Sequence, residues 1–396
     1  MRKQKIWVVV ASVMMVLGFG VWAAAEEGVT DTEIHIGQWG PQTGPAAPWG
    51  SVARGTGIYF DMINEEGGIN GRKIVYHMFD DAYNPAKTKA GVKELQENIG
   101  MFAWACGVGT ATGLAVEDYL MERKIPWVGP AAGSLHWISP PKRYLFAVYP
   151  LYYNEARVLT QYAVEKLGKK RIAMAYQNDD YGKNGVSGAE KELAKHGMEL
   201  VAKVPVELTD TDMKPHIMQL RKAKADTVLL WVTPVHAVRL LGTGAAMQFT
   251  PQWMSTSTCS DFPLMYQISK GLWKGVIVGN FGELPDSQLP LMQKYKTAFD
   301  KYAAKGERWG VFLYAGFGFV EPMVEGLKRT GRNLTRERFV MAMEQIRDFK
   351  GIFGNISYGP FDPNYVFCRQ GQNEIFLTRC LEGAKAEKLT DWIEPH

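Results

Sequence analysis

The sequence has few cysteines and histidines and only a small net charge. Its 396 residues include four cysteines and seven scattered histidines, and the formal net charge is only +4. A nucleic-acid partner would need a strong basic excess on one face, so none is expected. The hydrolase motifs G-x-S-x-G and H-E-x-x-H are missing. We therefore expect no metal, no cofactor and no enzymatic activity.

Apolar runs of near-membrane length are confined to the N-terminus. Arg2, Lys3 and Lys5 precede an uncharged, mostly apolar segment over residues 6–22, and alanines fill positions 23–25. This order is typical of a cleavable signal peptide. A transmembrane anchor is the alternative, but the segment is short for a span and two glycines interrupt it. We expect cleavage before Glu26 and a soluble, monomeric protein in the periplasm.

One disulfide is suggested by the cysteine positions. Cys368 and Cys380 flank a turn signal at residues 371–373 with strand-like residues on both sides, so a hairpin would bring the two sulfurs together. Zinc is the alternative, although the spacing matches no common zinc pattern. Cys106 and Cys259 are interpreted as separate buried thiols.

Short apolar runs alternate with amphipathic stretches along the chain. A first series predicts strands at 33–39, 73–79, 101–106 and 125–128, and helices at 50–66, 85–99 and 112–123. A second series predicts strands at 171–176, 199–206, 227–232 and 252–255, and helices at 155–167, 182–196, 213–223 and 235–247. Regular alternation of strand and helix implies parallel strands with helices on both faces.

The two series predict two lobes. Three late helices, at 289–304, 311–329 and 336–345, have too few strands beside them to form a third domain, so we expect them to cover the first lobe. The predicted fold class is α/β, with two doubly wound parallel-sheet lobes joined by a multi-strand hinge that allows closure around a ligand. The expected division is a signal peptide over 1–25, a first lobe over 26–147 plus 279–355, and a second lobe over 148–278 plus 356–396.

Five short motifs carry a resemblance to a known family. They are I-G-Q-W-G-P-Q-T-G-P at 36–45, N-E-E-G-G-I-N-G at 64–71, D-D at 80–81 followed by Pro85, P-A-A at 130–132, and D-Y-G at 180–182. Each is weak alone, but their order and spacing resemble type I periplasmic binding proteins of the branched-chain amino acid importer class. The resemblance implies the two-lobed fold, no cofactor, and delivery of a small-molecule ligand to ABC permease subunits in the inner membrane.

The resemblance also implies ligand-binding residues at the carboxyl ends of strands, between the lobes. They are Trp49, Thr110, Ala131, Gly133, Ser134, Tyr181, Thr233 and Ser257. Thr110 takes the place of a serine that grips the ligand carboxylate. Because it follows a strand and precedes a helix, its hydroxyl and nearby free N–H groups can meet an anion. An ordinary N-cap threonine is the alternative.

The other members of this set have more varied roles. Ala131 would offer its backbone carbonyl, and Ser134 would substitute for a family threonine that falls on Gly133. Tyr181 corresponds to a tyrosine that reaches the ligand from the second lobe, and Trp49 to an aromatic residue beside the ligand side chain. Packing within its own lobe is the alternative for each aromatic residue. Asp81 is interpreted instead as a structural cap or turn residue.

Two departures from the family pattern bear on the ligand. The acid that pairs with the α-ammonium group in amino-acid-binding members falls near residues 255–258, where Ser257 stands and no acid occurs, and Thr233 replaces a tyrosine. Glu283 or Asp261 could replace the missing acid, although the spacing offers no support. A buried ammonium without a carboxylate partner is costly. An amino acid, a carboxylate without an ammonium, an amide and an aromatic acid all stay open.

Two other functions fit parts of the sequence. G-V-G-T-A-T-G at 107–113 resembles the loop of a dinucleotide-dependent oxidoreductase, but its last spacing is one residue too long and it follows the third strand of its series. A ligand sensor that presents the same fold to a receptor is the second alternative. Neighbouring permease genes would favour transport, and turnover of a ligand would reveal an enzyme.

Overall fold

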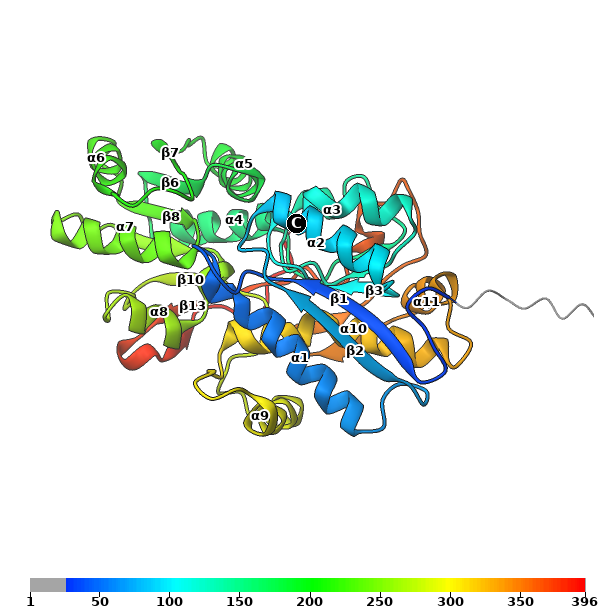
Figure 1. Cartoon of the computed structure of the whole chain (residues 1–396). Coiled ribbons are helices and arrows are strands. Elements are labelled where there is room, and N and C mark those ends of the chain that lie inside the picture. Colours follow the sequence, from blue (N-terminus) through cyan, green and yellow to red (C-terminus); the bar gives the residue numbers. More distant parts are fainter. Residues whose placement is uncertain (1–25, 396) are drawn as a thin grey trace, which may run out of the picture.

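The computed structural model describes residues 26–395, so the predicted signal peptide over 1–25 lies outside the described residues. Two lobes, each built on its own sheet, lie side by side (Figure 1). Within the described part of the chain, no helix combines the length and the hydropathy needed to cross a membrane.

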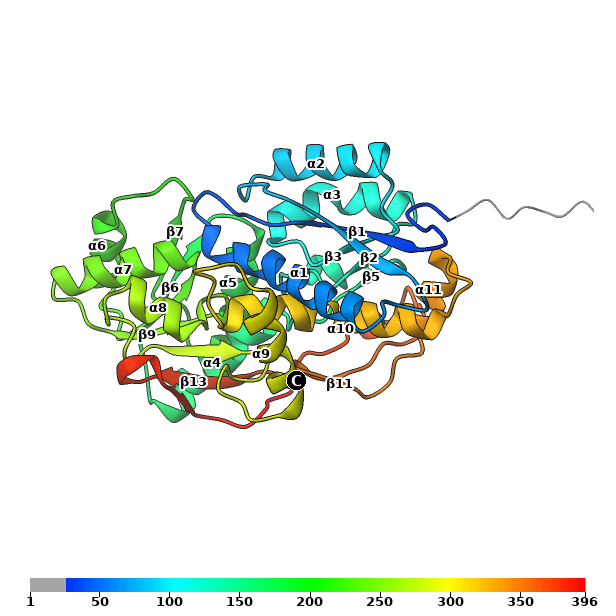
Figure 2. The ribbon, with the colours of Figure 1, turned by 60° about the horizontal axis from the view of Figure 1, so that its bottom comes forward.

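The first lobe is built on five parallel strands in the order β2-β1-β3-β4-β5. They are β1 (Glu33–Trp39), β2 (Lys73–Phe79), β3 (Ala103–Ala105), β4 (Trp127–Val128) and β5 (Leu145–Phe146). Its helices are α1 (Gly50–Glu65), α2 (Pro85–Asn98), α3 (Thr110–Glu122), α9 (Pro290–Tyr302), α10 (Val311–Thr330) and α11 (Arg336–Met343). Figure 2 shows α2 and α3 on one face of this sheet, and α1 with α10 on the other.

The second lobe is built on seven strands in the order β14-β13-β10-β9-β8-β6-β7. They are β6 (Ile172–Gln177), β7 (Ala202–Val206), β8 (Thr227–Trp231), β9 (Gln252–Ser255), β10 (Ile277–Asn280), β13 (Phe376–Cys380) and β14 (Ala386–Lys388). Its helices are α4 (Tyr152–Gln161), α5 (Asp180–Lys195), α6 (Lys214–Lys222), α7 (Pro234–Ala246) and α8 (Phe262–Ile268). The five strands β7, β6, β8, β9 and β10 are parallel to one another. The strand β13 is antiparallel to β10, and β14 is antiparallel to β13. The predicted fold class is confirmed.

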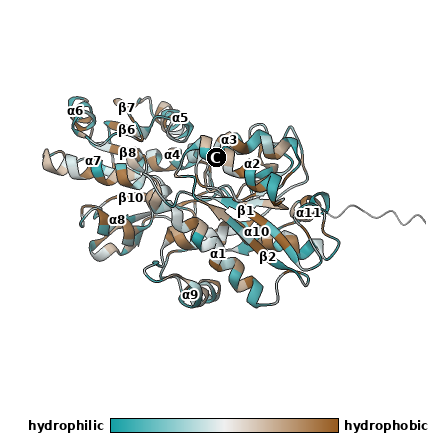
Figure 3. Cartoon of the chain, in the orientation of Figure 1, coloured by the Kyte–Doolittle hydropathy of each residue, from teal (hydrophilic) through white to brown (hydrophobic). Residues whose placement is uncertain are grey.

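Short elements complete the chain. A two-stranded hairpin is formed by β11 (Phe349–Gly351) and β12 (Gly354–Ile356), and a π-helical stretch (Tyr162–Lys166) extends α4. Single 3-10 turns are η1 (Ala47–Trp49), η2 (Leu135–Trp137), η4 (Ser257–Cys259), η5 (Val366–Arg369) and η6 (Glu382–Ala384). Most helices alternate hydrophilic and hydrophobic residues, as expected where one face packs on a sheet (Figure 3).

The lobes are joined by three stretches of the described chain: after β5, after β10 and before β13. The first and third run side by side, because the Ala147 N–H donates to the Arg369 carbonyl and the Gly371 N–H donates to the Ala147 carbonyl, both over 2.8 Å. The predicted boundary at 278/279 falls inside β10, which belongs wholly to the second sheet. The other lobe boundaries stay predictions.

Local sequence signals explain several of these elements. The Asn84 side chain accepts hydrogen bonds from the N–H groups of Ala86 and Lys87, and Pro85 is the first residue of α2, so the predicted helix start is confirmed. Asp81 accepts from the Tyr83 N–H over 3.0 Å and from the Thr88 hydroxyl over 2.7 Å. These bonds confirm that Asp81 fixes the turn between β2 and α2.

Cysteine pairing departs from the prediction. All four cysteines are buried free thiols, which confirms the interpretation of Cys106 and Cys259. Cys368 lies in η5, and Cys380 ends β13, whose partners are β10 and β14. The predicted hairpin across residues 371–373 is therefore wrong, and the Cys368–Cys380 disulfide that depended on it is not formed.

Candidate functional site

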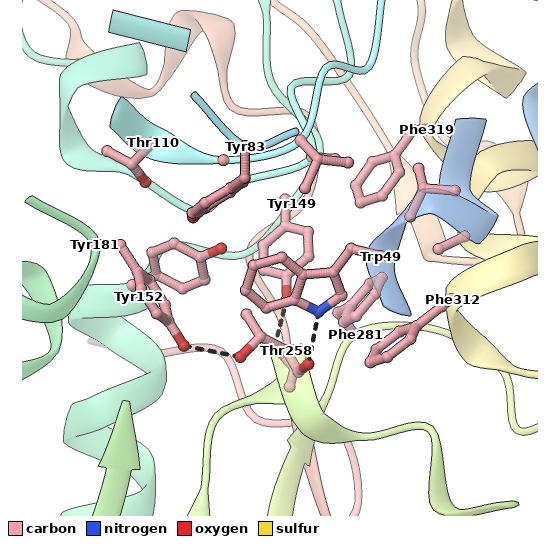
Figure 4. Close-up of a pocket in the computed structure, with 16 residues that line it drawn as sticks. Trp49, Tyr83, Thr110, Tyr149, Tyr152, Tyr181, Thr258, Phe281, Phe312 and Phe319 are labelled. Atoms are coloured by element: carbon pink, nitrogen blue, oxygen red, sulfur yellow. Dashed lines mark hydrogen bonds between the residues drawn. The ribbon is translucent and has the colours of Figure 1, made fainter. Parts of the chain in front are cut away.

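A small cavity of about 40 Å³ lies between the lobes and is lined by both (Figure 4). Three loops that follow first-lobe strands contribute to it, together with α10 and the start of α1. The second lobe contributes the starts of α4 and α5 and the loops after β9 and β10. The sixteen lining residues are Trp49, Val52, Tyr83, Val108, Gly109, Thr110, Ala131, Tyr149, Tyr152, Tyr181, Ser257, Thr258, Phe281, Phe312, Ala315 and Phe319.

The N-terminus of α3 forms one polar point of the cavity. Gly109 precedes it with φ 105°, and a Cβ atom there would lie 2.5 Å from the Tyr83 ring, so only glycine fits. Thr110 is the first residue of α3, and the N–H groups in the first turn of this helix have no intrahelical acceptors. The Thr110 hydroxyl is buried and has no hydrogen-bond partner among the described residues. It forms no capping bond, so the N-cap alternative is wrong.

The other polar groups of the wall are largely engaged with one another. The Trp49 indole N–H donates to the Thr258 carbonyl over 3.0 Å, which is a hydrogen bond between the lobes. The Tyr181 hydroxyl shares a hydrogen bond of 2.8 Å with the Thr258 hydroxyl, and the Tyr149 hydroxyl one of 2.7 Å with Ser257 (Figure 4). Thr110 therefore offers the hydroxyl that most needs a partner.

Aromatic rings make up the rest of the wall. The Tyr149 and Phe319 rings are stacked with centroids 5.6 Å apart, and Phe281 packs against both of them. The Tyr152 and Tyr181 rings meet edge to face at 4.9 Å. The wall is therefore mainly apolar.

The wall carries no net charge at neutral pH. Burial raises the pKa of the Tyr149 and Tyr181 hydroxyls well above their usual value, so both stay protonated. Glu155, in the first turn of α4, lies behind Ser257 and accepts from its N–H and from the Thr256 hydroxyl. Burial raises the pKa of Glu155 to about 7 against these two hydrogen bonds. Glu155 does not line the cavity.

Neither of the two acids suggested as ammonium partners lines the cavity. Asp261 accepts from the Leu264 N–H at the start of α8 and from the Phe312 N–H at the start of α10, over 3.1 and 3.2 Å. It thus joins a helix of each lobe. Glu283 accepts from the Ser287 hydroxyl over 2.9 Å. The suggestion that either replaces the missing acid is wrong for this structure.

Five of the eight predicted site residues meet at the cavity: Trp49, Thr110, Ala131, Tyr181 and Ser257. They come from both lobes, as the resemblance implies. The Ala131 carbonyl accepts from the Gly109 N–H over 3.5 Å, so it also supports the loop before α3. Whether each residue contacts a ligand stays a prediction.

Three predicted residues lie outside the cavity, each for a packing reason. A Cβ atom at Gly133 would lie 2.1 Å from the Pro150 carbonyl oxygen, so this position faces the start of α4. The Ser134 hydroxyl caps η2 by accepting from the His136 N–H over 3.2 Å. The Thr233 hydroxyl caps α7 and lies 2.6 Å from the His236 ring nitrogen. The structure therefore corrects the prediction for these three residues, which do not line the cavity.

Sequence reasoning missed most of the aromatic wall. Tyr83, Tyr149 and Phe281 each follow a strand of the described sheets within four residues of its end. Because ligands of α/β sheets bind beyond the carboxyl ends of strands, that position was a usable signal. Phe312 and Phe319 lie on α10, and the sequence holds no signal that this late helix reaches the cleft.

Alternative chemistries find little support at this site. Among the described residues, no group of three or more His, Cys, Asp or Glu side chains is placed to hold a metal ion. The loop over 107–113 does lead into a helix, but the space above it is only about 40 Å³. A dinucleotide does not fit this space as the lobes stand in this structure.

Comparison with known proteins gives the family. Residues 33–368 match the family described as periplasmic binding protein. A Leu/Ile/Val-binding protein of Rhizobium johnstonii is 23% identical over 342 residues, covering 83% of this chain and 88% of the relative. A fatty acid ABC transporter substrate-binding protein from Thermomonospora curvata shares the fold with a TM-score of 0.83, 23% identity and coverage of 93% and 94%. An ABC transporter solute binding protein from R. palustris in complex with benzoate has a TM-score of 0.79, 19% identity and coverage of 91% and 96%. The chain belongs to the periplasmic binding protein family, in the type I class of the branched-chain amino acid binding proteins.

Proposed function

We propose that this protein binds a small organic acid or amino acid between its lobes and presents it to the permease of an ABC importer. The observation that carries the proposal is the cavity itself. Groups from both lobes line it, and the buried Thr110 hydroxyl faces it without a partner at the N-terminus of α3. A helix N-terminus with a free hydroxyl suits a carboxylate. Leucine, fatty acids and benzoate, named for the relatives, all carry one.

Three hydrogen bonds join the lobes in this structure, at the cavity and at its edges. Trp49 donates to the Thr258 carbonyl, Asp261 accepts from the Phe312 N–H, and the Leu135 N–H donates to the Asn184 side chain over 3.1 Å. A ligand that contacts both lobes at once stabilises the closed state relative to the open state, and only that difference drives closure.

The ligand itself can be identified directly from the protein that carries it. Protein purified under native conditions is denatured, and the released small molecules are identified by mass spectrometry. We expect one organic acid or amino acid at near-stoichiometric amount. Stripped and refolded protein should bind that compound again and return it chemically unchanged. Conversion of the compound would show an enzyme instead.

Thr110→Val tests the site. Losing a hydrogen bond to a charged carboxylate costs about 1.5–3 kcal/mol, so the dissociation constant should rise roughly 10- to 150-fold. Thr160→Val is a matched control, because the Thr160 hydroxyl is also buried without a partner but lies in α4 away from the cavity wall. Equal dissociation constants for the two variants would remove Thr110 from the site.

A role in transport can be distinguished from a role in sensing by the membrane protein to which this protein delivers or presents its ligand. For an importer we expect uptake of the released compound by vesicles that carry the cognate permease, and only when this protein is added. A sensor would instead bind a receptor without uptake. N-terminal sequencing of the exported protein should begin at Glu26, and a retained N-terminus would favour an anchored form.

A further inference from the structure

The cavity wall combines many rings with no ionic side chain. Eight of its sixteen residues are aromatic, and none of the sixteen is Asp, Glu, Lys, Arg or His. The wall hydroxyls of Tyr149, Tyr181, Ser257 and Thr258 are paired with one another. One end of the cavity, at Thr110 and the first turn of α3, combines a buried hydroxyl that has no partner with the free N–H groups of a helix N-terminus, and this combination suits an anion.

Two buried acids behind this wall already have partners for their oxygens. One Glu155 oxygen accepts from the Ser257 N–H and the other from the Thr256 hydroxyl. One Asp261 oxygen accepts from the Leu264 N–H and the other from the Phe312 N–H. Neither acid lines the cavity. An α-ammonium group bound here would lose its water without gaining a carboxylate in exchange.

Cation–π contacts do not replace that carboxylate. A primary ammonium has three N–H donors, and ring faces satisfy them poorly compared with oxygen acceptors. Several ring faces are also covered by other rings, since Phe319 stacks on Tyr149 and lies parallel to Phe281 with centroids 6.1 Å apart. The rings therefore suit an apolar ligand body better than a cation.

Given the function proposed above, we propose that the cleft selects a monocarboxylate with an apolar, ring-sized body and no α-ammonium group. The carboxylate lies at Thr110 and the start of α3, and the body packs among the aromatic rings. Selection against amino acids comes from the missing counter-ion at the Ser257–Thr258 wall. The proposal concerns only the ligand class, so it can fail while solute binding stands.

Matched ligand pairs test this directly. Stripped, refolded mature protein is titrated calorimetrically with 3-phenylpropanoate against phenylalanine, and with 4-methylpentanoate against leucine. The members of each pair differ only in the ammonium group. We expect 3-phenylpropanoate to bind most tightly, and each acid to bind at least tenfold more tightly than its amino acid. Glycine betaine, which carries a quaternary ammonium, should bind more weakly than either acid.

Three outcomes overturn the proposal. Amino acids that bind as tightly as the ammonium-free acids, or betaine that binds more tightly than both, would show that the wall accepts a cation. Failure of all five compounds to bind below 1 mM, roughly the weak end of specific affinities, would exclude the ligand class. In each case the natively released compound separately decides whether the protein is a solute-binding protein at all.

A designed counter-ion gives a second test. Thr258→Asp places a carboxylate on the wall and keeps an acceptor for the Tyr181 hydroxyl, and Thr258→Asn has the same shape without the charge. We expect T258D to shift the ratio of the two dissociation constants at least tenfold toward phenylalanine, and T258N to leave it unchanged. Circular dichroism confirms that both variants fold. An unchanged ratio in T258D would contradict the reasoning.

Discussion

Glu155 connects the cavity wall with the pH dependence of stability. Its carboxyl is buried beneath Ser257, and burial raises its pKa from 4.5 to about 7. Between these two values the folded protein keeps a proton that the unfolded chain releases, so the free energy of unfolding falls as pH rises. A difference of about 2.5 pKa units corresponds to about 3 kcal/mol between pH 4 and pH 8. Glu155→Gln removes this loss because the amide does not titrate.

The assay is urea unfolding of the mature protein at intervals from pH 4 to pH 8. Relative to the wild type, E155Q should gain about 3 kcal/mol between the ends of this range. Glu321 is a useful comparison, since burial raises its pKa to about 7 as well, while its partners are the Tyr295 hydroxyl and the Ile352 N–H. E321Q should flatten the profile by a similar amount, and the double variant by the sum. Parallel profiles for E155Q and the wild type would refute the argument that Glu155 takes up a proton on folding.

Two further variants test packing and the contact between the lobes. Gly133→Ala should lower the free energy of unfolding by about 1–3 kcal/mol, because the added Cβ meets the Pro150 carbonyl oxygen. The control is Gly242→Ala in α7, where a Cβ meets nothing within 4 Å, and this variant should be neutral or stabilising. A tolerated G133A would show that this turn can move. Asp261→Asn puts an amide N–H against the Phe312 N–H or the Leu264 N–H, so the dissociation constant of the released ligand should rise about 5- to 30-fold. An unchanged constant would mean that the bond between α8 and α10 does not contribute to closure.

Local patterns were enough to predict the strands β1 to β4 of the first sheet and β6 to β9 of the second. The period-two pattern of β1 and the Asn-Pro start of α2 are written within a few residues, and both were found where expected. The antiparallel pairing of β13 with β10 was missed, because pairing between strands about a hundred residues apart leaves no local signal. The same omission produced the wrong hairpin between Cys368 and Cys380.

The site was harder to predict because it depends on which side of a turn faces the cleft. The family resemblance pointed to Thr110, and its position after β3 at the start of α3 agrees with that role. Gly133 and Ser134 occupy the next loop, yet that loop turns against the start of α4, and the steric contact with Pro150 is invisible in one sequence. Phe319 reaches the cavity from a helix that the sequence indicates only as a cover for the first sheet.

The size of the cavity sets a condition on the bound state. A void that binds benzene measures about 150 Å³, whereas the cavity here measures about 40 Å³. A ring-sized ligand therefore requires the lobes to stand farther apart than in this structure. We expect the hydrogen bond from the Trp49 indole N–H to the Thr258 carbonyl to stretch first, because these two residues line the cavity from opposite lobes. We expect a crystal structure of the complex with 3-phenylpropanoate to show this N–O distance beyond 3.5 Å, with the inter-lobe rotation taken up in the three connecting stretches. A complex that kept the 3.0 Å bond and the present cavity would admit only a ligand of a few atoms, and selection by the aromatic wall would then have no physical basis.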